Sequence, residues 1–378
     1  MRAIFCTFTR AKLALLASLA VLGFGQSQHA HAEPYLAVQN GYKCVQCHVN
    51  PTGGGLRSTF GDVFSQNVMA MNTLPEGVPT WLGQAVGDVI RVGGNLRADY
   101  SVQTTPGAPT INGFDLEQFR LYADINLIPN LLGIYVDEQV APGAQTMEAY
   151  ARIGSTSDWY IKAGRFYLPF GWRLQDQTAF VRLDSFINMA LPDDGVEFGI
   201  ERGKLSAQID FTNGTVNNEG TGYQVTSNVV WVESAWRVGA SGSFIESRSA
   251  NFLGLGNRWE EALYAGVRTG PVAWLAEADL IRQAGNPAPG PGTQTQVPEF
   301  LEADWLIHKG NNLKLTYEYY DPEKQASDNG QTRWSAVYEL TPIPFFQIRA
   351  GYRRYEGNPR TTADFNQTLA FVEAHAFL

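Results

Sequence analysis

The sequence predicts an all-β protein, in which a transmembrane antiparallel β-barrel of about 16 strands follows a short N-terminal segment. Three observations predict this fold class. From about Asp88 onward, segments of roughly ten residues alternate in polarity, as membrane barrel strands do. Glycine (38), tyrosine (16) and tryptophan (9) are abundant, and no stretch after Phe24 is apolar for long enough to be a membrane helix. The mean hydropathy of −0.19 is compatible with a barrel, because alternation hides its apolar residues.

Residues 1–32 have the features of a signal peptide. Basic residues flank an apolar run from Leu13 to Phe24, and Ala30-His31-Ala32 has the small residues that signal peptidase requires. The run is shorter than the roughly 20 residues of a bilayer-spanning helix, which argues against a permanent membrane anchor. We therefore expect cleavage after residue 32 and a mature chain outside the cytoplasm.

The expected mature chain is acidic. Residues 1–32 contain three of the 28 lysines and arginines and none of the 37 aspartates and glutamates, so their removal leaves 25 basic and 37 acidic residues, a formal net charge of −12. This charge argues against nucleic acid as a partner, because polyanions are bound by clustered lysines and arginines.

One motif of the N-terminal segment indicates a cofactor. Cys6 lies in the expected signal, so the mature chain keeps Cys44 and Cys47, within Cys44-Val45-Gln46-Cys47-His48. C-x-x-C-H is the pattern of covalent haem attachment, in which two thiols join the haem vinyl groups and the adjacent imidazole binds the iron. We predict one haem c, held by Cys44 and Cys47 with His48 as an axial ligand.

Three other interpretations of this motif are weaker. A zinc site would need further ligands nearby, and His308 and His375 lie far along the sequence. A disulfide between the two cysteines would close a loop too small to stabilise the chain much. A thioredoxin-like redox pair would lie in a βαβ unit, which is missing here.

The second axial ligand is less well defined. Met69 and Met71 are the only methionines near the motif, and a thioether ligand would raise the haem potential. The simpler interpretation is an apolar patch, Val68 to Met71, that packs on the porphyrin. His375 is a weaker candidate, and an iron with one protein ligand or a water ligand stays open. The following Pro51-Thr52-Gly53-Gly54-Gly55 predicts a tight loop close to the haem edge, and it lacks the Lys-Ser/Thr of a phosphate-binding loop.

Alternation within single segments predicts which face of each strand meets lipid. Three segments show it, with the apolar set first in each: Met147, Ala149, Ala151 and Ile153 against Thr146, Glu148, Tyr150 and Arg152; Leu205, Ala207, Ile209 and Phe211 against Lys204, Ser206, Gln208, Asp210 and Thr212; Trp334, Ala336, Tyr338 and Leu340 against Arg333, Ser335, Glu339 and Thr341. The final strand, Leu369 to Leu378, is expected to point Glu373, His375 and Phe377 inward. A soluble propeller is the alternative, but no repeated blade motif is present.

Connections are expected to alternate in length. Short turns are expected at residues 128–130, 155–157, 269–271, 309–311 and 341–344, and long polar loops at Ala284 to Gln296 and Asp321 to Gly330. Short turns of such barrels face the periplasm, which predicts that both chain ends lie there. The acidic residues Asp193, Asp194, Asp321 and Glu323 are expected to be solvated loop charges rather than sites that attract metal cations.

The segment Pro34 to Pro51, with Phe60-Gly61, resembles the fused outer-membrane monohaem cytochrome–porin family, the extracellular electron conduits of iron-oxidising bacteria. Ala163 to Gly171 is similar to a motif of phosphate-selective-type porins. The resemblance implies a monohaem cytochrome c segment at residues 33–87 and an outer-membrane porin-like barrel at residues 88–378. The Gly53-Gly54-Gly55 run departs from the iron-oxidiser pattern. This departure weakens the argument for iron as the substrate more than the argument for electron transfer.

The expected function is electron transfer across the outer membrane through this one haem. The partners would be a periplasmic electron carrier and an extracellular donor or acceptor, with Fe(II) one candidate; in that case the protein would act as an Fe(II) oxidase. The alternative is a diffusion porin of the anion or phosphate type, whose haem segment gates or stabilises the pore. A haem enzyme such as a peroxidase would need positioned distal groups, which the sequence does not show. The sequence does not distinguish a single barrel from a homotrimer.

The haem segment is expected to dock inside the barrel. A segment of this size buries too little apolar surface to be comfortably stable alone, and a barrel of about 16 strands leaves an aqueous lumen. We therefore predict a lumen plug. The lumen residues expected to line its seat are Glu148, Arg152, Lys162, Arg237 and Arg333.

Overall fold

The computed structural model describes residues 33–187, 191–214, 222–246, 257–286, 292–358 and 366–378, so the expected signal peptide lies outside it. The helices are α2 (Pro34–Asn40), α3 (Cys44–Cys47), α4 (Thr59–Phe64), the π-helix η1 (Ser65–Met69) and α5 (Phe180–Leu183). The strands are β1 (Gln84–Val86), β2 (Ile90–Thr104), β3 (Ile111–Ile128), β4 (Leu132–Ala141), β5 (Gln145–Ser155), β6 (Trp159–Phe166), β7 (Asp193–Arg202), β8 (Leu205–Thr212), β9 (Tyr223–Val232), β10 (Trp236–Glu246), β11 (Arg258–Thr269), β12 (Val272–Asn286), β13 (Gly292–His308), β14 (Asn311–Asp321), β15 (Gln331–Ile343), β16 (Phe346–Gly357) and β17 (Gln367–Phe377). Within these ranges, no helix is both long and apolar enough to cross a membrane.

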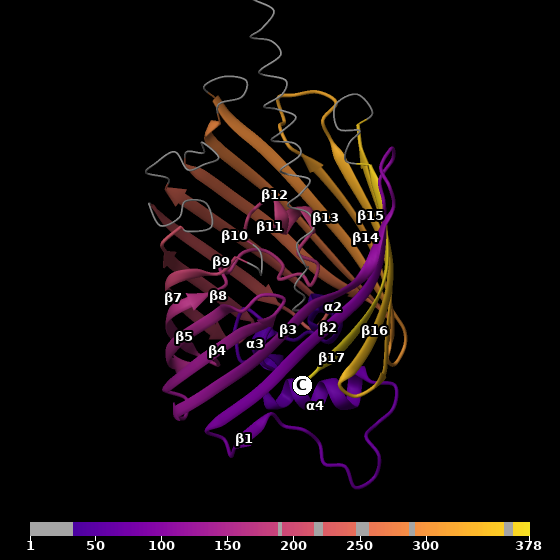
Figure 1. The fold of residues 1–378 in the computed structure, drawn as a ribbon. Helices are drawn as coiled ribbons and strands as arrows, with labels where there is room; N and C mark the ends of the chain where they lie inside the picture. Colours follow the sequence, from indigo (N-terminus) through magenta and orange to yellow (C-terminus); the bar gives the residue numbers. More distant parts are fainter. Residues whose placement is uncertain (1–32, 188–190, 215–221, 247–256, 287–291, 359–365) are drawn as a thin grey trace, which may run out of the picture.

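Strands β2 to β17 form one closed antiparallel barrel (Figure 1). Each pairs with the next along the chain, and β17 pairs with β2, for example Phe377 with Asn95, which closes the cylinder. The short strand β1 pairs with the start of β2. Closure leaves the sheet no free edge, so its backbone groups are satisfied in lipid. The predicted fold class and the predicted number of strands are therefore confirmed in the described part of the chain.

The predicted alternation is present along the strands. In β8, Ile209 and Phe211 are exposed on the outer surface, whereas Gln208 and Asp210 are buried on the lumen side. The same holds for the inward residues of β17, which are Glu373, His375 and Phe377. The barrel is therefore apolar outside and polar inside, as a membrane barrel must be.

Tryptophans mark the two ends of the apolar surface. Seven of the nine lie exposed near strand ends: Trp159, Trp231, Trp236, Trp274 and Trp305 at the end with the short turns, and Trp259 and Trp334 at the other end. In the β10–β11 pair, Trp236 faces Val267 and Phe244 faces Trp259, so the two belts are eight positions apart. At about 3.4 Å per residue and a tilt of roughly 40°, this separation is about 21 Å, close to the apolar band of about 25 Å in outer-membrane barrels.

Three details of the strand prediction are wrong. Met147, assigned to the lipid side, is buried against Tyr167, because it is the extra residue of a β-bulge. The loop expected at residues 284–296 is largely strand, since Ala284 pairs with Thr293 beyond the apolar band. The turn expected at residues 341–344 comes slightly later, because β15 continues to Ile343.

The connection between β6 and β7 folds into the barrel. We call residues 167–187 the inward loop. Its helix α5 contacts β12, β13 and β14 across the lumen. The backbone N–H groups of Trp172 and Phe180 donate to Glu277 and Glu318 of the wall, each at 2.8 Å. These contacts narrow the lumen from within.

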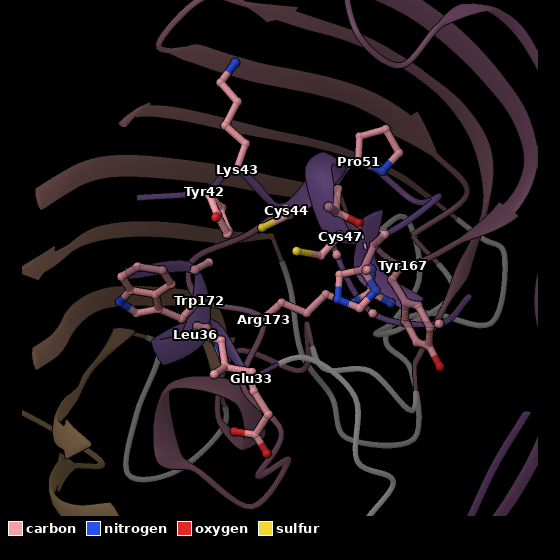
Figure 2. A pocket seen from close by; sticks show the side chains of 18 of the residues that line it. Glu33, Leu36, Tyr42, Lys43, Cys44, Cys47, Pro51, Tyr167, Trp172 and Arg173 are labelled. Carbon is pink, nitrogen blue, oxygen red and sulfur yellow. Dashed lines mark hydrogen bonds between the residues drawn. The ribbon is translucent and has the colours of Figure 1, made fainter. Parts of the chain in front are cut away.

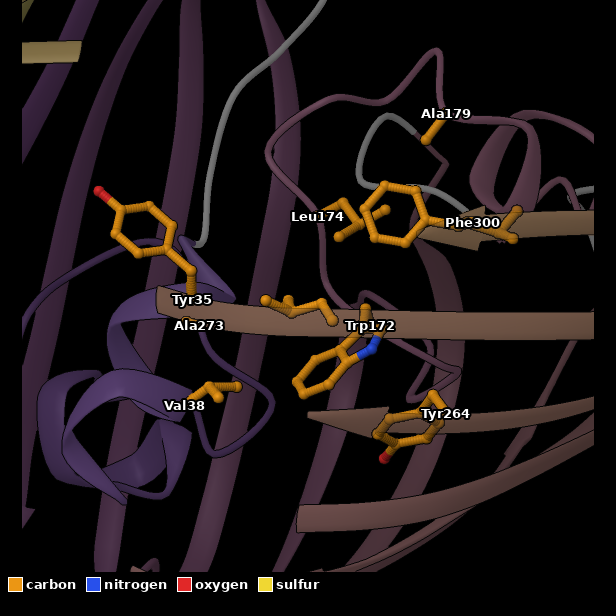
Figure 3. Packing of buried hydrophobic residues seen from close by; sticks show 10 residues of the cluster. Tyr35, Val38, Trp172, Leu174, Ala179, Tyr264, Ala273 and Phe300 are labelled. Carbon is orange, nitrogen blue, oxygen red and sulfur yellow. The ribbon is translucent and has the colours of Figure 1, made fainter. Parts of the chain in front are cut away.

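The first part of the N-terminal segment, with α2 and α3, lies inside the barrel, and we call the whole segment, residues 33–83, the plug. Helix α2 packs against β11 and β12, and α4 lies at the end of the barrel where the chain ends (Figure 1). One buried cluster joins plug, inward loop and wall; it includes Tyr35, Val38, Trp172, Leu174, Tyr264, Ala273 and Phe300 (Figure 3). The apolar core of the molecule therefore lies in the lumen, between these three parts.

Candidate functional site

The C-x-x-C-H motif lies on a folded arm of the plug. Cys44 to Cys47 form helix α3, and the His48 N–H donates to the Cys44 carbonyl at 3.0 Å. The chain then turns back, so that His48 pairs with Arg57 and the Ser58 N–H donates to the Cys47 carbonyl at 2.9 Å. This arm, residues 44–58, holds both cysteines and the histidine in one rigid unit.

The glycine run forms the turn of the arm, as predicted. Gly53, Gly54 and Gly55 all have positive φ, between 63° and 91°, which other residues rarely adopt. A Cβ on Gly55 would lie 2.1 Å from the Tyr135 hydroxyl, and one on Gly54 would lie 3.0 Å from the Arg173 guanidinium carbon. The glycines therefore let the arm approach both the wall and the inward loop.

Two of the five predicted seat residues hold the plug. Glu148 accepts from the Asn50 amide at 2.8 and 3.0 Å, and Arg237 donates to the carbonyls of Ala37 (2.7 Å) and Tyr42. The other three are engaged elsewhere: Lys162 pairs with Glu197, Arg152 with Asp124, and Arg333 with Glu318 and with Asp176 of the inward loop.

Cys44, Cys47 and His48 line one cavity with the inward loop and the wall. Figure 2 shows both sulfur atoms directed into this space, which Trp172 and Arg173 face from the inward loop. Further aromatic side chains of the lining include Phe64, Tyr167, Phe170 and Phe377. In the described part of the chain, no three His, Cys, Asp or Glu side chains gather as ligands for a bare metal ion.

Burial sets the protonation states of the motif. Burial, together with Arg57 and Arg173, lowers the pKa of His48 to about 3, so the imidazole is neutral near pH 7 and offers a lone pair. Burial and the neighbouring Cys44 raise the pKa of Cys47 to about 11, and burial also raises the pKa of Cys44.

Five arginines line the cavity: Arg57, Arg97, Arg173, Arg182 and Arg237. Lys43 and Glu33 also line it, and Arg97 and Arg182 are paired with Glu373 and Glu277. Nε and Nη2 of Arg173 and Nε of Arg97 are buried without a hydrogen-bond partner among the described residues, although Arg173 Nη2 lies 3.6 Å from Glu148. Buried donors without acceptors are costly, so these groups indicate an anionic occupant. A haem fits this donor set, because it is a flat apolar ring with two propionates; a small anion fits the cations but not the aromatic lining.

The candidate second ligands lie in different places. Met69 and His375 both line the cavity. Met71 lies at the turn between β13 and β14, where its N–H donates to the Thr341 carbonyl at 2.9 Å and a Cβ on Gly310 would meet its side chain. The structure thus brings Met69 and His375, but not Met71, to the cavity.

The acidic residues expected in loops have mixed environments. Asp193 is fully buried at the start of β7, where its carboxylate accepts from the Gly214 N–H at 2.7 Å, so the expected solvated charge is wrong there. Asp321 ends β14 and accepts from the Glu323 N–H at 3.1 Å.

Sequence reasoning found Arg237 but missed the other arginines of the cavity, Arg57, Arg97, Arg173 and Arg182, and the aromatic residues of the inward loop. Trp172 and Arg173 follow directly on the porin-like segment Ala163 to Gly171, which was the one available signal. That signal indicates a barrel, and it does not indicate that the following residues turn inward.

No protein-family model and no curated protein sequence matches the chain. The structure is similar to solved outer-membrane proteins. These include the anion-selective porin from Comamonas acidovorans (13% identity, TM-score 0.59, 76% of this chain and 99% of that chain), in-vitro folded OmpT of Vibrio cholerae in its trimer form (11%, 0.59, 77% and 100%) and the outer membrane channel DcaP of Acinetobacter baumannii (12%, 0.56, 78% and 99%). At these identities the similarity shows the fold alone.

Proposed function

We propose that this chain is an outer-membrane electron-transfer protein that carries one c-type haem inside its barrel. One observation carries the proposal: the C-x-x-C-H motif lies in the lumen, on a cavity lined by aromatic side chains and arginines. A haem would supply a one-electron carrier at a place where lipid separates the two aqueous phases.

Each part of the site has a separate role in this proposal. Cys44 and Cys47 would hold the haem by thioether bonds, and His48 would bind its iron from one side. Arg173 through Nε and Nη2, and Arg97 through Nε, which are buried without an acceptor among the described residues, would receive the propionates. The plug and the inward loop would exclude bulk water from the cavity.

The orientation follows from the turns of the barrel. The plug helix α4 and the C-terminus lie at the end that carries the short turns, such as the one at Gly310 beside Met71. Short turns face the periplasm in outer-membrane barrels, so we place the C-terminus and α4 there, while Glu33, the first described residue, lies in the lumen beside Lys314 at 3.0 Å. A periplasmic carrier would exchange electrons at this end and an extracellular donor or acceptor, Fe(II) among the candidates, at the other. The trimer form of OmpT makes a homotrimer part of the proposal.

A haem stain and a reduced-minus-oxidised spectrum of the outer-membrane fraction test the proposal. The chain should show a covalent haem band that disappears when Cys44→Ala and Cys47→Ala are combined. The amount of folded barrel, measured by its heat-modifiable electrophoretic mobility, should be the same for the native chain and for the double cysteine variant. A correctly inserted barrel without any haem band would overturn the proposal.

The second candidate is a diffusion porin for anions, and the comparisons by themselves favour it, since the similar proteins include an anion-selective porin. The arginines of the lumen support it as well. Against it, the plug and the inward loop occupy the lumen. Anion-selective conductance of the intact chain, at the level of an open 16-stranded porin, would favour this candidate.

A further inference from the structure

His375 is a buried side chain of the wall that the roles assigned above do not use. It lies on β17, is 5% exposed and lines the same cavity as Cys44, Cys47 and His48. We propose that His375 supplies the second axial ligand of the haem iron. This inference rests on the proposed function and adds the ligand that completes the site.

The hydrogen bonding of the imidazole leaves one nitrogen available. Nδ1 of His375 lies 3.1 Å from Oε1 of Gln347 on the neighbouring strand, and an amide oxygen can only accept, so Nδ1 carries the proton. Nε2 then carries a lone pair. It is buried and has no hydrogen-bond partner among the described residues. Metal-bound histidines have this arrangement, in which a second group fixes the tautomer and the ring orientation.

The nearest acid on the same strand is engaged by arginines. Glu373 accepts from Arg97 at 2.7 Å and from Arg349 at 3.2 Å. Among the described residues, the hydrogen-bond partner of the imidazole is therefore Gln347 and not a carboxylate.

The arm that carries His48 lies directly against the strand that carries His375. Arg57 pairs with His48 through its backbone. Its guanidinium lies 4.5 Å over the ring of Phe377 and donates to the Leu378 carbonyl at 3.4 Å. The rings of Phe377 and His375 have their centres 4.9 Å apart. The two imidazoles thus reach the cavity from two adjoining but separate parts of the molecule, the plug and the wall.

Met69 is the competing ligand, since it also lines the cavity. It ends the short helix η1, next to Val68, which is half exposed. His375 lies on a paired strand of the barrel, and its orientation is fixed by Gln347. A preset ligand loses less conformational freedom on binding iron, so the geometry favours the histidine.

Spectroscopy of the purified full-length chain with its haem attached tests this assignment. The oxidised protein should be low-spin by electron paramagnetic resonance and should lack the near-infrared charge-transfer band of methionine ligation. His375→Ala should give a high-spin, carbon monoxide-binding haem without loss of the haem stain, and added imidazole should restore the low-spin signal. Met69→Leu, the matched control, should leave the spectrum unchanged.

A second variant covers the case in which His375→Ala destabilises the barrel. Gln347→Leu removes only the acceptor of Nδ1–H; it should raise the midpoint potential while the spectrum stays low-spin, because the imidazole becomes a weaker donor. A low-spin His375→Ala protein, or a high-spin Met69→Leu protein, would overturn the assignment and leave the haem itself in place. A barrel without haem would overturn both proposals.

Discussion

Gly61 of α4 lies directly against the backbone of the C-x-x-C-H motif. A Cβ on Gly61 would lie 2.1 Å from the carbonyl oxygen and 2.9 Å from the carbonyl carbon of Cys47. Both are backbone atoms of the arm, which is held by its own hydrogen bonds and cannot easily move aside. Helix α4 therefore reaches the motif only because residue 61 has no side chain.

We expect Gly61→Ala to loosen the packing of α4 on the motif, since α4 must move away at a cost of roughly 1–3 kcal/mol. The rate of protease cleavage within residues 33–83 of the inserted barrel measures this effect and should rise. Gly113→Ala is the matched control, because a Cβ there meets nothing within 4 Å. Equal cleavage rates in the two variants would show that the contact is unimportant.

The sequence predicts individual site residues only where the chemistry is local. Cys44, Cys47 and His48 are adjacent, and their spacing alone suggests the haem. Arg97 and Arg173 look like ordinary wall and loop residues, and they acquire a role only when β2 and the inward loop meet around the cavity. No short-range sequence pattern indicates that β2 and the inward loop lie together around the cavity.

At the level of elements, α2 is held in the lumen by arginines that bind its carbonyl groups. Arg237 is buried and donates to Ala37 at 2.7 Å and to Tyr42, whereas the more exposed Arg268 donates to Gln39 at 2.9 Å. Hydrogen bonds from a charged group contribute more when they are buried. Arg237 is therefore the stronger of the two attachments.

Arg237→Gln should loosen the plug by about 2–3 kcal/mol, because it leaves buried carbonyl groups without a donor. The expected result in planar bilayers is more frequent opening to a high-conductance state, together with faster protease cleavage within residues 33–83. Arg268→Gln should change both by a much smaller amount. Opening at the same frequency in the two variants would argue against this attachment.

The strands and the inward loop differ in how well their sequences predict them. Strands such as β8 have a period of two, because one face meets lipid and the other the lumen. Residues 167–187 have no period, and their mixture of aromatic and polar residues is equally typical of an outward loop. What turns them inward is the set of carboxylates on the far wall, including Glu277 and Glu318, which accept from the backbone of the loop.

At the scale of the whole molecule, a wide barrel is filled by two segments of its own chain. The closed cylinder and its approximate strand number follow from composition and alternation. The positions of the plug and the inward loop do not follow from them, because the alternation of polarity occurs only in the strands of the wall. Whether solutes pass therefore depends on the plug and the inward loop together.

Removal of residues 33–83 should raise single-channel conductance severalfold and leave a barrel that still inserts, because β1 and the wall are untouched. Planar bilayer recordings of the intact and truncated chains measure this difference. The double cysteine variant provides the control for loss of haem without loss of the plug. Unchanged conductance on truncation would mean that the plug does not close the lumen in the membrane.

The contact between Arg57 and the last two residues of the chain has a consequence for biogenesis. It joins positions from opposite ends of the sequence, and Phe377 belongs to the strand that closes the barrel against β2. The arm is therefore enclosed on this side once β17 has paired with β2. For the haem that we propose, this means that an attachment enzyme would act on Cys44 and Cys47 before the barrel closes, and a cell that delayed attachment would insert barrels that can no longer be loaded.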